Sequence, residues 1–368
     1  MTSTYLVKTI TRAEHSQWVA SRPSLSFLQT PEWAEVKREW RAESVGWFKD
    51  GVLIGAGLVL YREAPVIKRS LAYLPEGPDL DWLGDEVVEQ LRALVAHVKT
   101  QGAFTVKIGV PVIARIWRNE TIKEAIGTAH RLSDVAADQE VERALELKLA
   151  LSANGWRQES ASEGFGDVQP RYVFTVDVAG KSDEELLASF NQLWRRNLKK
   201  AEKSGVAVRL GDRADLAAFH EVYVETAKRD GFHPRPLSYF ERYWDAFHPS
   251  ERIRLYLAEV NGEVAASTIW IQVGTHAWYS YGASTTKHRD FRPSNAIQWR
   301  MLTDSRDAGA SVYDLRGISD TLDESNPLFG LIRFKLGIGG QAVEYVGEHD
   351  FDINPLLAKL FRWYLQKR

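Results

Sequence analysis

The sequence of 368 residues contains no cysteine, only two methionines and no long apolar run. Without cysteine the chain has no disulfide framework, no thiol nucleophile and no metal site with cysteine ligands, and this absence suits a reducing compartment. No stretch of about 18 consecutive apolar residues occurs, so we expect no transmembrane helix. The first residues, MTSTYLVKTITRAEHSQW, lack the apolar core of a signal peptide. We therefore expect a cytoplasmic protein.

An excess of one charge sign is also lacking. The chain has 47 Lys and Arg against 49 Asp and Glu, a net charge of -2. Binding of nucleic acid or phosphate must therefore come from a local patch and not from the surface as a whole. Hydrophobic residues make up 44% and aromatic residues 11%, which is enough for packed cores. The length favours two domains.

Two segments resemble copies of one strand-turn-strand unit. Residues 45–63 carry Asp50-Gly51, and residues 255–273 carry Asn261-Gly262, each between apolar runs. Such dipeptides are the strongest short signal for a β-hairpin. The turns lie roughly 210 residues apart, which indicates an internal duplication; two unrelated hairpins are the alternative.

Predicted helices and further strands surround each hairpin. The predicted helices are residues 30–40, 138–153, 194–203, 215–229, 294–308 and 354–368, and the strands after the linker are residues 171–178, 278–285 and 312–318. Their alternation favours an α/β or α+β fold, and the order in each half resembles the GNAT acyltransferase fold. Gly, Ser, Pro and acidic residues cluster at 160–170, the predicted linker. We expect tandem GNAT-like domains at 1–165 and 166–344, with 345–368 packing back on the first domain.

Six further segments support a family resemblance. They are SFLQTPEWAEVKREW (26–40), LAYLPEGP (71–78), the stretch 169–206, RDGFHPRPLSYF (229–240), WYSYGAST (278–285) and FKLGIGG (334–340). In this order they are similar to segments of the FemABX family of peptidoglycan bridge-forming aminoacyltransferases. Some members carry a helical-hairpin (coiled-coil) arm in the second domain; none is visible here, so the chain resembles the short, arm-less FemX type.

The resemblance implies a defined reaction. The side-chain amine of the third stem-peptide residue attacks the ester carbonyl of aminoacyl-tRNA, and the acceptor is lipid II or UDP-MurNAc-pentapeptide. Aminoacyl-tRNA is then the co-substrate, and no metal or other cofactor is expected. The transferred residue (Gly, Ala or Ser) stays open, as do the third stem residue (lysine or a diaminopimelate) and peripheral contact with the inner face of the membrane.

Ester aminolysis needs little covalent help from a protein. An amine with a pKa near ~10.4 must lose its proton, two large substrates must be aligned, and an oxyanion must be stabilised. The resemblance assigns Lys335, next to Phe334, to the reacting carbonyl, where it stabilises the oxyanion or handles the proton of the leaving ribose hydroxyl. The glycines after Lys335 would let the backbone approach the tRNA end closely. The alternative is a surface lysine beside a glycine turn.

Four further residues match acceptor-binding positions of the family. Lys37 and Arg235 match positions that bind a diphosphate, for which a lysine charge and an arginine fork are suited. Tyr239 and Tyr281 match positions against the acceptor's sugar or peptide. Tyr239 shares a face with Arg235 if that segment is helical. The alternatives are an exposed helix face for Lys37 and ordinary core tyrosines for the other pair.

One local positive patch is present in the predicted helix at 194–203. Its basic residues are Arg195, Arg196, Lys199, Lys200 and Lys203. We expect this patch to meet the tRNA acceptor stem or anionic lipid head groups, and a solvated helix face is the alternative. The family often shows an acid where this chain has residues 107–111, which contain none, so a carboxylate base at that place is in doubt.

Three other functions compete. The first is an acyl-CoA N-acyltransferase, but residues 289–296 lack the glycines that cradle a pyrophosphate, and Pro293 removes an amide donor. The second is a binding module for tRNA or lipid that has lost activity. The third is a tRNA-dependent ligase that acts on a peptide natural product.

Overall fold

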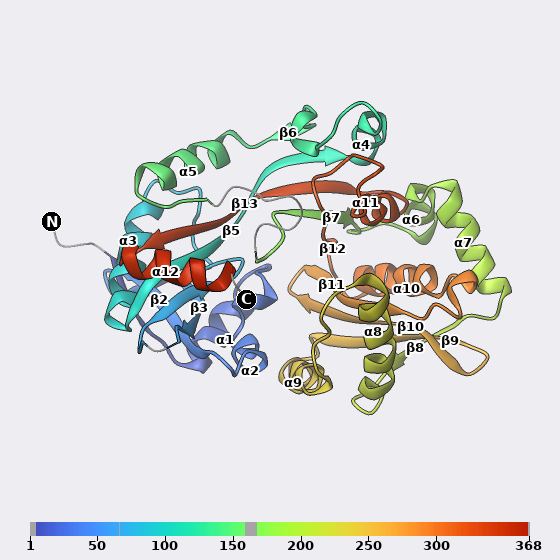
Figure 1. Cartoon of the computed structure of the whole chain (residues 1–368), viewed down its shortest axis with the longest axis horizontal. Coiled ribbons are helices and arrows are strands. Elements are labelled where there is room, and N and C mark those ends of the chain that lie inside the picture. Colours follow the sequence, from blue (N-terminus) through green and yellow to red (C-terminus); the bar gives the residue numbers. More distant parts are fainter. Residues whose placement is uncertain (1–4, 66, 159–167, 367–368) are drawn as a thin grey trace. The chain divides into compact units, whose positions relative to one another are not determined.

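The computed structural model describes residues 5–65, 67–158 and 168–366, and the chain divides into two compact units (Figure 1). The first unit comprises Met1–Trp117, Ala136–Tyr172 and Val343–Arg368, and the second comprises Arg118–Val135 and Val173–Ala342. Most of the predicted linker, residues 160–167, lies outside the described residues.

The second unit takes residues 118–135 from within the expected first domain. Asn119 belongs with the glycine-rich segment after Lys335, because its N–H donates to Gly340 O at 3.2 Å and its Nδ2 donates to Leu336 O at 3.1 Å. Leu132 N–H likewise donates to an oxygen of this unit, Asp320 O, at 2.8 Å. The division between units therefore differs here from the expected boundaries.

The first unit is built on a sheet with the strand order β1-β2-β3-β4-β5-β13, to which β6 adds at β5. Its strands are β1 (Tyr5–Thr9), β2 (Arg41–Lys49), β3 (Val52–Glu63), β4 (Ser70–Leu74), β5 (Ala103–Arg118), β6 (Gln139–Glu140) and β13 (Gln341–Asp352). Its helices are α1 (Arg12–Ala20), η1 (Phe27–Gln29), α2 (Pro31–Val36), α3 (Val87–Thr100), α5 (Glu142–Ala153) and α12 (Pro355–Gln366).

The second unit is built on a sheet with the order β7-β12-β11-β10-β9-β8. Its strands are β7 (Tyr172–Asp177), β8 (Ala207–Gly211), β9 (Ile253–Val260), β10 (Glu263–Val273), β11 (His276–Ser284) and β12 (Val312–Gly317). Its helices are α4 (Asn119–Ala125), η2 (Leu132–Asp134), α6 (Asp183–Ser189), α7 (Gln192–Lys203), α8 (Leu216–Asp230), α9 (Leu237–Phe247), η3 (His248–Ser250), η4 (Arg289–Phe291), α10 (Pro293–Asp307) and α11 (Phe329–Leu336).

The two units repeat one order of elements. The first runs β1, α1, α2, β2, β3, β4, α3, β5, and the second runs β8, α8, α9, β9, β10, β11, α10, β12. In each, successive strands pair antiparallel until the last pair, β4–β5 or β11–β12, which is parallel. The hairpin turns also match, with φ values of 51° and 81° at Asp50-Gly51 and of 52° and 80° at Asn261-Gly262. The predicted hairpins are confirmed, and the repeat supports the duplication.

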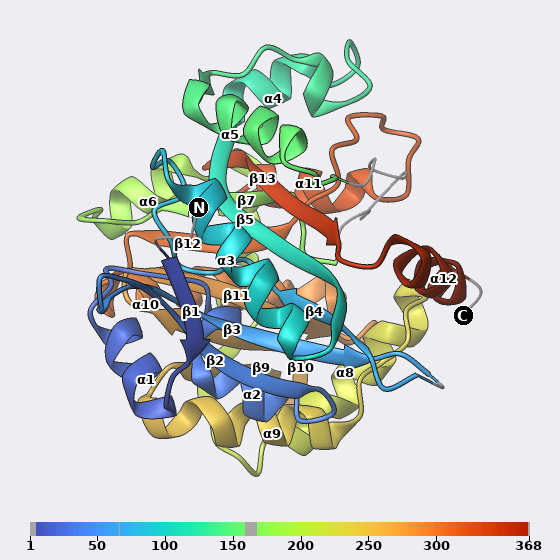
Figure 2. The ribbon, with the colours of Figure 1, turned by 90° about the vertical axis from the view of Figure 1, so that its left-hand side faces the viewer.

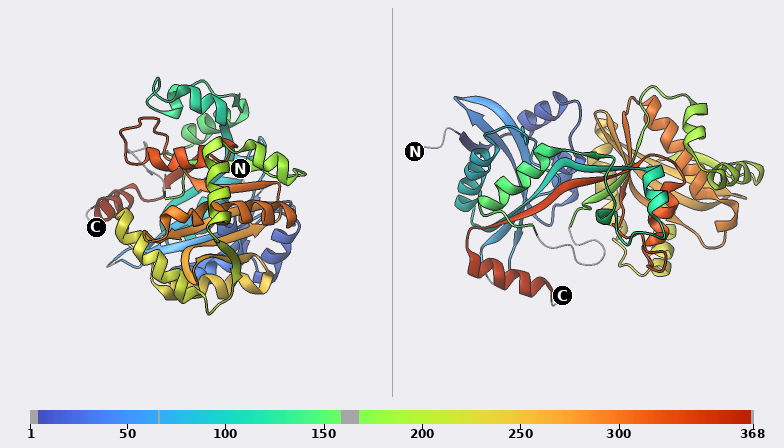
Figure 3. Two further views of the ribbon diagram at one scale, coloured as in Figure 1. Left: turned by 90° about the vertical axis from the view of Figure 1, so that its right-hand side faces the viewer. Right: turned by 90° about the horizontal axis from the view of Figure 1, so that it is seen from above.

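Alternation along single strands places helices on both faces of each sheet. In the first unit, two side chains of β2 bond to different helices. Trp47 Nε1 donates to Gln90 O of α3, and Ser44 Oγ lies 2.8 Å from His15 Nδ1 of α1; Figure 2 shows both helices beside the sheet. In the second unit, Trp270 of β10 bonds to α10 through Ser305 Oγ. Helix α8 bonds instead to the end of β11, where Thr226 Oγ1 donates to Ser284 O. The ribbon is seen from the side of this unit in Figure 3, left. Each sheet is thus covered on both sides, which accounts for the continuous runs of buried residues along β3 and β10.

Several predicted helices differ from the observed ones at their ends. The helix expected at 30–40 is α2, which stops at Val36; Trp40 N–H then donates to Lys37 O in a turn that leads into β2. Thr30 does not cap it with its side chain, because Thr30 Oγ1 donates to Phe27 O. The helix expected at 138–153 begins only at Glu142, since residues 139–140 form β6. The basic helix at 194–203 is confirmed as part of α7.

Helix lengths bear on two expectations. The helices described for the second unit have at most 15 residues, as in α8 and α10, so a helical-hairpin arm is not evident in the described part of the chain. Among the same described residues, every helix is too short or too polar to cross a bilayer.

Candidate active site

Lys335 is buried inside the second unit. Its residue is 3% exposed, and it lies in the last turn of α11. The ammonium nitrogen donates hydrogen bonds to Gly317 O at 2.6 Å and to Arg316 O at 3.1 Å. A buried lysine is uncommon unless its head group is satisfied. The surface-lysine alternative is therefore wrong.

An irregularity in β12 supplies the two carbonyl groups. The pairing of β12 with β7 shifts register between Asp314 and Gly317. Arg316 has a φ of 63°, an uncommon value for a residue other than glycine. Its N–H donates to Asp314 Oδ1 at 2.5 Å, a contact that stabilises this local turn. The bulge directs the carbonyl groups of Arg316 and Gly317 toward Lys335, as bulges near functional sites often redirect groups.

Two polar side chains, Asp314 and His276, lie beside this bulge. The Asp314 carboxylate is 2% exposed, and His276 Nε2 lies 3.3 Å from its Oδ2. Burial raises the pKa of Asp314, but the His276 contact and the Arg316 charge outweigh burial, so this pKa lies below its usual value. Asp314 therefore stays ionised inside the unit.

Burial lowers the pKa of Lys335 from 10.5 to about 7. The Asp314 charge opposes this change, and the Arg316 charge adds to it. A substantial fraction of the amine is then neutral near neutral pH. A lysine with such a pKa is able to accept and return a proton, or to present a charge to an oxyanion, at physiological pH.

Phe334 and the following glycines pack closely against α7 and β7. The Phe334 ring lies 4.8 Å from the Trp194 ring, and Trp194 Nε1 donates to Phe334 O at 3.0 Å. A Cβ atom on Gly337 would lie 1.9 Å from Trp194 Cδ1, and one on Gly340 would lie 2.2 Å from Thr175 O. The lack of a side chain at these glycines thus leaves room for the Trp194 ring and for the Thr175 carbonyl group. Their expected role in approaching tRNA stays a prediction, and so does the catalytic role of Phe334.

Arg235, Tyr239 and Tyr281 come together in the second unit. The Arg235 guanidinium lies 4.6 Å from the centre of the Tyr239 ring, a cation–π contact. The hydroxyl groups of Tyr239 and Tyr281 are 3.1 Å apart. Tyr239 is 3% exposed, and burial raises its pKa well above the usual value. This arrangement leaves an exposed arginine beside two tyrosine hydroxyl groups.

The expected helical face shared by Arg235 and Tyr239 is wrong. Helix α9 begins at Leu237, and Pro236 precedes it, so Arg235 lies outside the helix. The backbone of Arg235 instead contacts α8, where His220 Nε2 lies 3.0 Å from the Arg235 carbonyl oxygen. The two residues still meet, through the cation–π contact.

Lys37 lies in the first unit, at the end of α2. Its Nζ is 3.5 Å from Glu39 Oε1 and 5.7 Å from the centre of the Trp40 ring. The Lys37 side chain is 18% exposed, so the fully exposed helix face is not its environment. Its expected role in binding a diphosphate stays a prediction.

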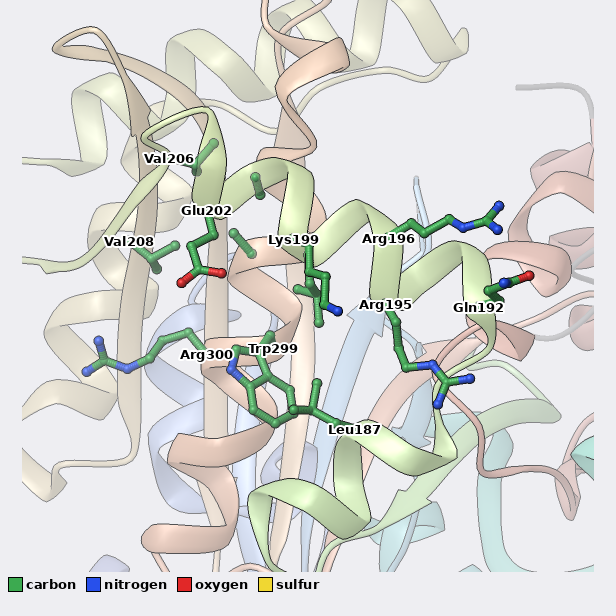
Figure 4. A pocket seen from close by; sticks show the side chains of 13 residues that line it. Leu187, Gln192, Arg195, Arg196, Lys199, Glu202, Val206, Val208, Trp299 and Arg300 are labelled. Carbon is green, nitrogen blue, oxygen red and sulfur yellow. The ribbon is translucent and has the colours of Figure 1, made fainter.

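The five basic residues of α7 are all exposed. Within the described part of the chain none of them has an ion-pair partner: Arg195, Arg196, Lys199, Lys200 and Lys203. Three of them border a groove of about 990 Å³ between α7 and α10 (Figure 4). The patch therefore has an unbalanced positive charge beside a concave surface.

Sequence reasoning missed the groups around Lys335. Asp314 and His276 were not singled out, and the turn at Arg316 has no sequence signal, since arginine is not a usual left-handed residue. The segment VYDLRGI does contain one signal, an aspartate between Tyr313 and Leu315 within a predicted strand. In the first unit, residues 107–111 contain no acid, and Lys107 Nζ donates to Asp350 Oδ2 of β13 at 3.1 Å.

Comparisons with known proteins place these features in a family. The model of the FemAB family matches residues 10–263 and 261–366. The Lipid II:glycine glycyltransferase of Staphylococcus aureus (strain MRSA252) is 26% identical over 422 residues, covering 95% of this chain and 94% of that protein. The protein of the same description from strain USA300 has the same identity and coverage.

Two solved structures bear on the fold. One described as a crystal structure of FemX has a TM-score of 0.79 and 25% sequence identity, covering 96% of this chain and 99% of that one. A tandem GNAT protein from the clavulanic acid biosynthesis pathway has a TM-score of 0.52 and 11% identity, covering 95% and 98%. The predicted fold, α/β with tandem GNAT-like domains, is confirmed.

Proposed function

Because the chain belongs to the FemAB family, we propose that it transfers an amino acid from aminoacyl-tRNA to the stem-peptide side-chain amine of a peptidoglycan precursor. Relatives at 26% identity over nearly the full length of both chains are described as lipid II:glycine glycyltransferases, which supports the aminoacyl transfer and the class of acceptor. Aminoacyl-tRNA as donor, and lipid II or UDP-MurNAc-pentapeptide as acceptor, belong to this proposal.

The buried Lys335 is the observation that carries the proposal. Attack by an amine on an ester produces an oxyanion and requires proton transfer to the leaving ribose hydroxyl. A lysine whose pKa is near 7 serves either need at neutral pH. The carbonyl groups of Arg316 and Gly317 hold its nitrogen in one place, so little reorganisation is needed during the reaction.

Arg235, Tyr239 and Tyr281 are proposed to contact the acceptor. The guanidinium is suited to phosphate oxygens, and the two hydroxyl groups are suited to sugar or peptide groups. Lys37, in the other unit, is proposed to contact phosphate as well. Lys37→Ala is expected to weaken acceptor binding on the order of tenfold, because one charge-assisted hydrogen bond is lost. Calorimetry measures this change in affinity.

Acyl-CoA is a poor donor candidate for the second unit. GNAT enzymes that use CoA bind its pyrophosphate on backbone amides at the start of a helix. Helix α10 begins with Pro293, which has no N–H, and the N–H groups of Asn295 and Ala296 already donate to Arg292 O. This arrangement favours a donor other than CoA.

A donor comparison tests the proposal. The purified chain is mixed with UDP-MurNAc-pentapeptide or lipid II and with radiolabelled Gly-, Ala- or Ser-tRNA, or with acetyl-CoA. The proposal predicts label in a precursor from one aminoacyl-tRNA, and loss of that transfer after ribonuclease treatment. Transfer from acetyl-CoA alone would contradict it.

A further inference from the structure

The groove between α7 and α10 combines two kinds of lining. Apolar side chains form its floor: Leu187, Leu198, Val206, Val208, Ala296 and Trp299. Basic side chains lie at its edge, and Figure 4 shows Arg195 and Lys199 extending from α7 toward the side of Leu187 and Trp299. The volume of about 990 Å³ is in the upper part of the ~300–1,000 Å³ range of ligand sites.

The charges at this edge are available to a ligand. Arg195 and Lys199 are exposed and, among the residues that the structure describes, have no ion-pair partner. Arg300, on the opposite wall, is different, because its Nε donates to Asp304 Oδ1 at 2.7 Å. Glu202 also lines the groove, and it is the one acidic residue among the described residues that do so. Two unbalanced cations one helical turn apart are suited to a phosphate group.

The ligand that fits both linings is amphiphilic and anionic. We propose that this groove binds an anionic phospholipid of a membrane, with the phosphate at Arg195 and Lys199 and an acyl chain over the apolar floor. The proposal concerns binding to a membrane surface and does not depend on the transfer reaction.

RNA is the competing ligand, and it would use the same helix differently. An RNA backbone is bound by a line of basic residues, so all five basic side chains of α7 would contribute, and an apolar floor would contribute little. A phospholipid depends on the residues that line the groove. Lys200 and Lys203 are exposed basic residues of α7 that do not line it, so they distinguish the two ligands.

The test is sedimentation of the full chain with vesicles of phosphatidylcholine containing about one third phosphatidylglycerol. The variant Arg195→Ala/Lys199→Ala is expected to lower vesicle binding on the order of 25-fold, because each basic residue near such a surface contributes about fivefold. The matched variant Lys200→Ala/Lys203→Ala removes the same charge and is expected to lower binding less than about fivefold. Vesicles of phosphatidylcholine alone should bind far less of the wild-type chain.

A third variant tests the floor without changing charge. Ala296→Phe fills part of the groove and is expected to weaken vesicle binding, while circular dichroism and the unfolding midpoint check that all variants are folded. An equal loss in the two double variants, with no effect of Ala296→Phe, would overturn the proposal in favour of general surface charge. Binding of an RNA acceptor-stem duplex that depends on all five basic residues, with no vesicle binding, would overturn it in favour of RNA.

Discussion

Replacement of Lys335 by methionine tests the central residue of the site. Methionine has a similar length and no charge, so the space is kept while the amine is removed. The change leaves the carbonyl groups of Arg316 and Gly317 without their donor, which costs roughly 1–3 kcal/mol each. It also removes a buried amine whose pKa is about 7 instead of 10.5, a burial cost of about 5 kcal/mol at ~1.4 kcal/mol per pH unit.

These opposing effects are of similar size, so the variant is expected to fold with a stability within a few kcal/mol of wild type. The sign of the lysine contribution follows from linkage: between pH 7 and about 10.4 the unfolded chain holds a proton that the folded chain does not, so wild-type stability rises with pH in this window. Urea unfolding at pH 6.5 and 9 measures this slope. Lys335→Met should lack it.

Activity is expected to fall by about 10²–10⁴-fold, the range for removing a general acid–base group or an oxyanion contact. The pH profile is more specific. The wild-type rate should rise up to about pH 7 and then level off, whether Lys335 acts as a base or as a cation. The variant rate should continue to rise with the free acceptor amine, whose pKa is about ~10.4.

Single-turnover transfer between pH 5.5 and 8.5 separates these profiles, and Arg333→Met, an exposed position of the same helix, is the control. A folded Lys335→Met variant that keeps near-normal turnover and the wild-type profile would exclude Lys335 from the chemical step.

Further predictions follow from neighbouring groups. Asp314→Asn should move the pH at which the rate levels off below 7, because the Asp314 charge raises the pKa of the buried lysine; an unchanged profile would show that the carboxylate has no such influence. Gly337→Ala should destabilise the chain by about 1–3 kcal/mol through overlap with an indole ring, whereas Gly330→Ala, with open space around it, should be neutral or slightly stabilising by thermal unfolding. Arg235→Ala should weaken acceptor binding about tenfold or more by calorimetry while leaving the unfolding midpoint near that of wild type; an unchanged affinity would remove it from the site. Burial lowers the pKa of His15 to about 4, so its contribution to stability is present above pH 6.5 and is lost as the pH falls to 4; His15→Gln should reduce the pH dependence of the urea midpoint in this window.

Local sequence signals predicted the repeated parts of the fold. Asp50-Gly51 and Asn261-Gly262 each form a left-handed two-residue turn that few other residue pairs adopt, so the hairpins were readable from the residues alone. Helix α7 could also be predicted from local signals. The helical spacing of its residues places Trp194 and Ala201 in the core and the basic residues outside.

The surroundings of Lys335 could not be read in this way. Asp314 and Arg316 are about 20 residues away along the chain, and they meet Lys335 only because β12 bulges beside β7. The bulge depends on a hydrogen bond between an aspartate and the backbone two residues on, which no periodic pattern announces. The contacts that place residues 118–135 in the second unit are also non-local. Asn119 is hydrogen-bonded to residues more than 200 positions away along the chain.

The position of the new amide bond is the most direct test of aminoacyl transfer to the stem peptide. The chain is incubated with aminoacyl-tRNA and two UDP-MurNAc-pentapeptide acceptors, one with a free side-chain amine on the third residue and one with that amine acetylated, and the products are fragmented by mass spectrometry. We expect one added amino acid on the side-chain amine of the free acceptor and none on the acetylated acceptor. Addition to the acetylated acceptor, or to any other position, would contradict this expectation.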